Sequence, residues 1–158
     1  MIVFKHQKGA EVYTKKILEK LNSTDFVNDA LTVTSFDQEY TEPVWITGFE
    51  IVEALINAED TKISVGFYRQ NWWSWKFAPV NAYVDYTGKN IFLNTRQLYR
   101  SEEDIEETIW HELVHVSDSL NTNAIYWHGD NKLAGKDRTA PVKFAKWAAN
   151  WKPKAPRC

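Results

Sequence analysis

The segment His111-Glu112-x-x-His115 holds the residues whose types and spacing are best suited to chemistry. An α-helix advances about 3.6 residues per turn, so two histidines four positions apart stand one above the other and can bind one metal ion. Glu112 lies about a quarter-turn round the helix axis, where its carboxylate can reach a water beside the metal without becoming a ligand. Two imidazoles and one carboxylate in this order are typical of zinc sites that hydrolyse bonds.

The surrounding residues predict the helix that this motif needs. Ser101 and the three acids after it form a helix-start signal, because the serine can accept a free backbone N–H and the acids suit the positive helix end. Apolar residues then recur at helical spacing: Ile105, Ile109, Leu113, Val116 and Leu120. The opposite side of the same helix carries Asp104, His111, His115 and Asp118. We therefore expect one buried face and one face that presents the histidines to a cleft. The alternative is that both histidines are structural residues on a solvated face.

A catalytic zinc usually has three protein ligands and an open fourth position, so a third ligand must be sought. No glutamate follows Glu112, which excludes a later Glu ligand, and the Gly and His of the metzincin pattern are absent after His115. The remaining candidates are Asp118, His128, Asp130 and Asp137.

Asp118 lies about 10 Å along the helix axis from His111, too far for both side chains to bind one ion easily. We expect it to accept the free N–H of a ligating imidazole instead. His128 is the preferred third ligand, because the turn-forming residues 121–123 end the helix and let the chain fold back over the metal. Asp130 remains the alternative.

The spacing of these residues resembles that of the SprT-like metallopeptidases. In this chain His111-Glu112-x-x-His115 is followed, after twelve residues, by His128-Gly129. The resemblance covers about residues 101 to 130, and it implies a zinc peptidase in which His111, His115 and His128 bind Zn²⁺ and Glu112 is the general base. It also implies a link to nucleic acid, since the family includes proteases that act on DNA-bound protein. The chain has no Cys-x-x-Cys pairs, so the zinc ribbon of some members is missing.

The pattern of elements predicts an α+β fold. Helices are expected over 9–21, 47–57, 101–120 and 139–147, and strands over 31–36, 62–68, 82–86 and 91–93, with a hairpin turn at 86–90. We expect a small zincin-like domain in which a mixed or antiparallel sheet packs on the active-site helix. The strand 89–95 is expected to border the cleft and to pair with an extended peptide substrate. The alternative is an ordinary sheet strand with no substrate role. A length of 158 residues and the absence of linkers favour one domain over 1–158.

Charge and composition give weaker expectations about partners. Eight basic residues and one acid, Asp137, follow residue 131, so the C-terminal helix and tail are basic. Such a segment can bind nucleic acid, although more often it is a solubilising end or packs against an acidic surface. The residues Trp72, Trp73 and Trp75 are either part of the core or a surface that binds a partner. In the second case, a further alternative is a zinc-binding scaffold without catalytic activity that binds its partner through these residues.

The expected location is cytoplasmic. Cys158 is the only cysteine, so no disulfide can form within the chain. The N-terminus lacks a signal-peptide pattern, and no apolar run approaches membrane-spanning length, so no membrane partner is expected. The expected partner is a protein or peptide substrate.

Overall fold

The fold is built on a four-stranded sheet with helices packed on one of its faces. The computed structural model describes residues 1–34, 36, 47–120 and 139–155. The strands are β1 (Val3–His6), β2 (Lys62–Tyr68), β3 (Ala82–Val84) and β4 (Asn90–Asn94), in the order β1-β2-β4-β3. β1, β2 and β4 are parallel, and β3 is antiparallel to β4. The predicted mixed sheet is therefore confirmed, as is the α+β class.

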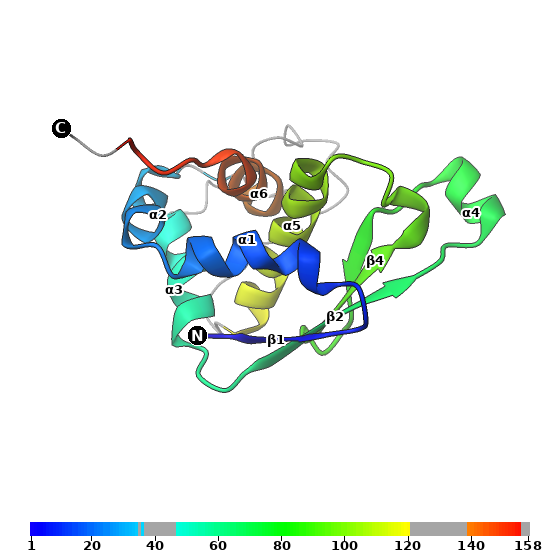
Figure 1. Cartoon of the computed structure of the whole chain (residues 1–158), viewed down its shortest axis with the longest axis horizontal. Helices are drawn as coiled ribbons and strands as arrows, with labels where there is room; N and C mark the ends of the chain where they lie inside the picture. Colours follow the sequence, from blue (N-terminus) through cyan, green and yellow to red (C-terminus); the bar gives the residue numbers. More distant parts are fainter. Residues whose placement is uncertain (35, 37–46, 121–138, 156–158) are drawn as a thin grey trace.

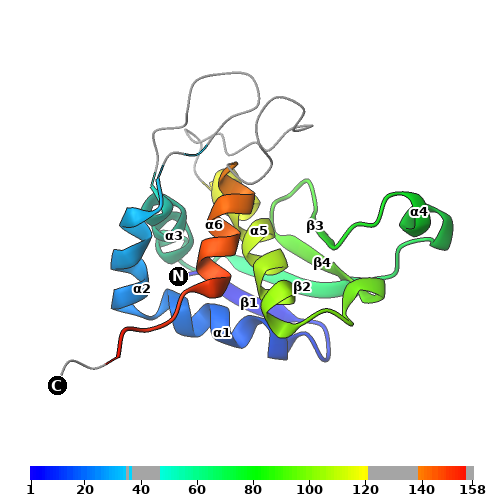
Figure 2. The same cartoon turned by 90° about the horizontal axis from the view of Figure 1, so that it is seen from above.

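Six α-helices accompany this sheet in the part of the chain that the structure describes. They are α1 (Glu11–Leu21), α2 (Thr24–Asp29), α3 (Gly48–Asn57), α4 (Trp72–Phe77), α5 (Glu102–Leu120) and α6 (Ala140–Asn150). Figures 1 and 2 show α1, α5 and α6 above the same face of the sheet, while α4 lies apart at one end. Buried strand residues alternate with less buried ones, as in Ile63, Val65, Ile91 and Leu93, so the core lies on the helix side.

α5 is the helix that carries the histidines, and its predicted start and faces are confirmed. Ser101 Oγ accepts the N–H of Asp104 at 3.1 Å, and three acids occupy the first turn. Ile105, Ile109, Leu113 and Val116 are buried in the single hydrophobic cluster of the described residues. The histidine side of α5 is consequently the side that remains for a site.

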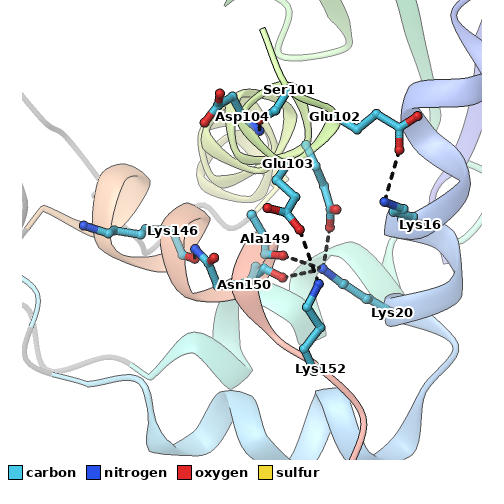
Figure 3. A network of polar contacts seen from close by, with 12 residues as sticks. Lys16, Lys20, Ser101, Glu102, Glu103, Asp104, Lys146, Ala149, Asn150 and Lys152 are labelled. Atoms are coloured by element: carbon cyan, nitrogen blue, oxygen red, sulfur yellow. Dashed lines mark hydrogen bonds and ion pairs between the residues drawn. The ribbon is translucent and has the colours of Figure 1, made fainter.

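Three polar contacts of Lys20 join α1 to α5 and to α6. Lys20 of α1 lies 2.5 Å from Glu106 of α5 and donates to the carbonyl oxygens of Ala148 and Ala149 at 2.7 and 3.1 Å (Figure 3). Glu106 also accepts the indole N–H of Trp110 at 3.2 Å. The lysine thus satisfies carbonyls at the end of α6 while pairing with a buried carboxylate.

The hairpin between β3 and β4 is held close to the C-terminal half of α5. Gly88 has a φ of +68°, a left-handed conformation that glycine adopts without strain. A Cβ at this position would lie 2.7 Å from Cβ of Ser119, so a larger residue would push the hairpin away from α5. The glycine therefore serves both the turn and the approach of β3 to the helix.

Several expected elements are confirmed and others differ. The helices expected over 9–21, 47–57 and 139–147 are α1, α3 and α6, and α3 begins with the predicted capping box, in which Glu50 accepts the N–H of Thr47 at 2.6 Å. The strand expected over 31–36 is wrong: Ala30–Thr32 forms a 3-10 helix that continues α2. α2 begins at a cap in which Ser23 accepts the N–H of Phe26. The alternating pattern of residues 31–36 does not show that a helix begins before them.

Among the residues that the structure describes, no helix combines the length and the apolar composition needed to cross a bilayer.

Candidate metal centre and active site

The two histidines of the motif stand together on α5. The ring centroids of His111 and His115 are 5.2 Å apart and their planes make an angle of 66°. Two imidazoles on one tetrahedral zinc, with N–Zn bonds of about 2.0–2.1 Å, have ring centres roughly 5 Å apart. The donor type and the spacing of this pair therefore fit zinc.

Glu112 points from the same helix toward β3. The side chain is buried, with 7% of its surface exposed. Burial raises the pKa of Glu112 from its ordinary value of 4.5 to about 7, while a hydrogen bond from the backbone N–H of Val84 acts in the opposite direction. The carboxyl is thus fixed between α5 and β3, the strand at this edge of the sheet.

A cleft of about 310 Å³ extends from this group along α5. Its walls come from α5, from the start of β3, from α6 and from the residues just before α5: Asn81, Ala82, Arg100, Asp104, Glu107, Thr108, His111, Glu112 and Val142. The opening is therefore bordered on one side by the histidine face of the helix and on the other by a strand.

Arg100 is fixed in the wall of this cleft by neutral oxygens. Its guanidinium donates to the Thr108 hydroxyl at 3.0 Å and to the carbonyl oxygens of Gln97 at 3.0 Å and Asp104 at 3.4 Å. Burial lowers the pKa of Arg100, although Asp104 is near enough to oppose that effect. The cleft therefore combines one positive and several acidic groups next to the histidines.

The strand that borders the cleft differs from the expected one. We expected the strand 89–95 to present a free edge, but β4 lies between β2 and β3, so both of its edges are occupied. The edge strand is β3. Its neighbours Asn81 and Asp85 bond to β4, at 2.9 Å with Asn94 and at 3.0 Å with Asn90. By antiparallel alternation, the backbone groups of Ala82 and Val84 point away from β4, toward the cleft side.

The main candidates for a third metal ligand lie outside the described residues. This holds for His128, for the alternative Asp130 and for Asp137, all within residues 121–138. The described residues alone contain no group of three His, Cys, Asp or Glu placed to hold a metal. His111 and His115 thus supply two donors, and the assignment of the third to His128 stays a prediction. Asp118 lies in α5, partly exposed, and its expected bond to an imidazole also stays a prediction.

Sequence reasoning missed several residues of the cleft. Glu107 and Thr108 precede His111 by four and three positions, so helical spacing alone places them on its face and could have indicated them. No comparable signal exists for Asn81, Ala82 and Arg100. Their place in the cleft depends on how the hairpin and the preceding loop dock against α5.

The basic C-terminal tail contacts acidic residues of the body. Lys154 lies 2.8 Å from Asp29, and Lys152 lies 3.5 Å from Glu103. Hydrogen bonds from Lys154 and from the indole of Trp151 lower the pKa of Asp29. Within the described part of this segment, Lys152 and Lys154 are therefore paired with acids of the chain, which agrees with packing against an acidic surface.

No protein-family model, no curated protein and no solved structure matches this chain. The chemistry that can be argued for it therefore depends on the residues of the site.

Proposed function

We propose that the protein is a zinc-dependent metallopeptidase that hydrolyses peptide bonds with Glu112 as general base. The observation that carries the proposal is the position of Glu112: its buried carboxyl and His111 line the same cleft, and the ring centroid of His115 lies 5.2 Å from that of His111. The zincin-like character of the fold and the resemblance to SprT-like metallopeptidases belong to the same proposal.

Each residue has a defined part in the proposed reaction. His111, His115 and His128 would hold the metal, and zinc when bound would polarise the scissile carbonyl and make a water acidic enough to attack near neutral pH. The carboxylate of Glu112 accepts the proton of the attacking water and returns it to the nitrogen of the leaving amine. The N–H of Val84 orients that carboxylate for both transfers.

The edge of β3 supports a peptide as the substrate. An extended peptide can add to a strand edge by backbone hydrogen bonds, and Ala82, whose backbone groups point away from β4, lines the cleft. Pairing at this edge would lay the peptide across the entrance of the cleft, in reach of Glu112. The same edge also explains how substrates of different sequence could bind, because backbone groups are common to all peptides.

The decisive test compares Glu112→Gln with the parent protein. We expect the variant to retain zinc, measured by elemental analysis, and to lose hydrolysis of a peptide library, because the base is removed and the ligands are kept. Glu103→Gln is the matched control, since Glu103 is an exposed carboxylate on the same helix. A Glu112→Gln variant that cleaves the library as fast as the parent would contradict the mechanism.

Removal of the metal gives a second test. A chelator should abolish hydrolysis, and added Zn²⁺ should restore it. If the purified protein instead holds its metal with four protein ligands and no open position, the silent-scaffold alternative is correct.

The nucleic-acid-linked alternative has less support. Lys152 and Lys154 pair with Glu103 and Asp29 rather than lying unpaired. DNA binding through the basic segment would weaken steeply with salt, so the absence of binding at low salt removes this alternative.

A further inference from the structure

An exposed aromatic helix projects from the end of the sheet. α4 lies in the connection from β2 to β3, and none of its six residues is buried. Phe77 exposes 75% of its surface, Trp73 64% and Trp72 45%. Both views show α4 away from the helices that cover the sheet (Figures 1 and 2). We call residues 69–80 the aromatic lobe. Large apolar side chains this exposed usually mark a contact surface.

Hydrogen bonds of Gln70 and Asn94 at the base of the aromatic lobe keep its aromatic rings exposed. Gln70 donates to the carbonyl of Ala78 at 2.9 Å and accepts the N–H of Val80 at 3.0 Å. Asn94 of β4 donates to Gln70 Oε1 at 3.1 Å and to the carbonyl of Val80 at 2.7 Å. The outgoing and returning chains are therefore tied to each other and to the sheet. These hydrogen bonds hold the aromatic rings outward, away from the core.

The charge of the aromatic lobe selects among partners. From Arg69 to Val84 the sequence contains no aspartate or glutamate, although the whole chain has a net charge of −2. Arg69 and Lys76 supply positive charge, and the ammonium of Lys76 lies 5.2 Å from the ring centroid of Trp72 and 5.8 Å from that of Phe77. Exposed tryptophan and phenylalanine interleaved with basic residues are the composition that binds an anionic lipid interface.

The size and shape of the surface also favour a bilayer over a protein. Trp72, Trp73 and Phe77 expose roughly 300–400 Å², if each ring can bury the usual 150–250 Å². A stable protein interface buries about 800 Å² on each partner. α4 is a protruding tip rather than a groove, and a tip can enter the boundary between lipid headgroups and acyl chains.

We propose that the aromatic lobe attaches the protein to the surface of an anionic lipid bilayer. Trp73 and Phe77 insert at the headgroup boundary, and Arg69 and Lys76 contact anionic headgroups. This attachment is peripheral and needs no spanning helix. It differs from the sequence-based expectation that no membrane is a partner, and it does not depend on the proposed peptidase activity.

Co-sedimentation with vesicles tests the proposal. The full chain should bind vesicles of phosphatidylcholine with phosphatidylserine and bind phosphatidylcholine alone more weakly. Trp73→Ser/Phe77→Ser should lose binding to both. Arg69→Gln/Lys76→Gln should weaken binding to the anionic vesicles by on the order of tenfold or more. Tyr86→Ser/Tyr99→Ser is the matched control, because both tyrosines are exposed but lie outside the aromatic lobe, and it should bind like the parent.

The opposing outcomes are equally definite. Circular dichroism should show that all variants keep the parent spectrum, since the changed residues are exposed or partly exposed. No binding of the parent to anionic vesicles, or undiminished binding of Trp73→Ser/Phe77→Ser, overturns the proposal. Sedimentation velocity adds one more result against it: self-association that the double variant abolishes, without vesicle binding, would assign the aromatic lobe to a second copy of the chain.

Discussion

Glu112 is a carboxyl group in a place that disfavours its charge. The side chain is 7% exposed, and the hydrogen bond from Val84 offsets only part of the desolvation that raises its pKa. A divalent cation between the neighbouring imidazoles would supply the missing positive charge. The cost of the buried carboxylate in the metal-free protein can be measured as a dependence of stability on pH.

The first prediction concerns the stability of the metal-free protein. With an ordinary pKa of 4.5 and a folded pKa of about 7, Glu112 does not destabilise the fold below pH 4.5, and its cost grows as the pH rises through 7. At pH 8 the cost is roughly 3 kcal/mol, because one pKa unit corresponds to about 1.4 kcal/mol. Glu112→Gln should thus stabilise the metal-free protein at pH 8 much more than at pH 5, as measured by urea unfolding. An equal effect at both pH values would contradict the burial argument.

The second prediction assigns the third ligand. His128→Ala should weaken zinc binding by orders of magnitude, because only two imidazoles remain, while Asp130→Ala should bind zinc like the parent. Competition with a chromophoric chelator measures both affinities. The reverse pattern would make Asp130 the ligand and would leave Glu112 and the two described histidines in their proposed roles.

At the scale of elements, the sequence predicts best where local signals and burial agree. The start of α5, its two faces and the capping box of α3 were predictable because hydrogen bonds within a few residues and helical spacing determine them. β1, α2 and α4 were missed. The sequence leaves the Trp72, Trp73 and Trp75 cluster open as core or binding platform. Trp72 and Trp73 are exposed, in a helix that Asn71 caps by accepting the N–H of Trp73.

The order of the strands in the sheet could not be predicted from local sequence patterns. Position in a sheet is determined by long-range pairing, so nothing near residues 89–95 shows that β2 occupies the other side of β4. The expectation of a free edge consequently fell on β4, although β3 is the strand at this edge of the sheet. β3 and β4 belong to the same hairpin. The expectation therefore identified the right part of the sheet but the wrong strand of the hairpin.

The third prediction tests the edge of β3. Ala82→Pro removes a backbone N–H that points away from β4, so the sheet should keep its own bonds while one bond to substrate is lost. We expect KM for peptides to rise by about 3- to 10-fold, the value of one hydrogen bond. Ala82→Gly keeps the N–H and is the control. An unchanged KM in Ala82→Pro, with normal folding by circular dichroism, would show that substrate does not pair at this edge.

At the scale of the whole molecule, opposite ends of the chain meet around α5. Lys20, Glu106 and the carbonyls at the end of α6 join residues that are 86 to 129 positions apart (Figure 3). The side chains of Lys20 and Glu106 are 12% and 5% exposed, so this pair is shielded from water. It also holds the N-terminal half of the helix that presents His111 and Glu112. Stability and site geometry are coupled through this lysine.

The last prediction follows from that burial. Lys20→Met leaves the carboxylate of Glu106 without its cation and the last carbonyls of α6 without their donor, and should lower the free energy of unfolding by about 3–5 kcal/mol. Lys16→Met is the control: Lys16 pairs with Glu102 at 3.3 Å with exposed fractions of 52% and 83%, and its loss should cost about 1 kcal/mol or less. Urea unfolding measures both. Replacing the pair together, Lys20→Met/Glu106→Leu, should recover much of the loss, because the uncompensated charge is then removed. If Lys20→Met and Lys16→Met cost the same, the buried pair does not hold α1, α5 and α6 together.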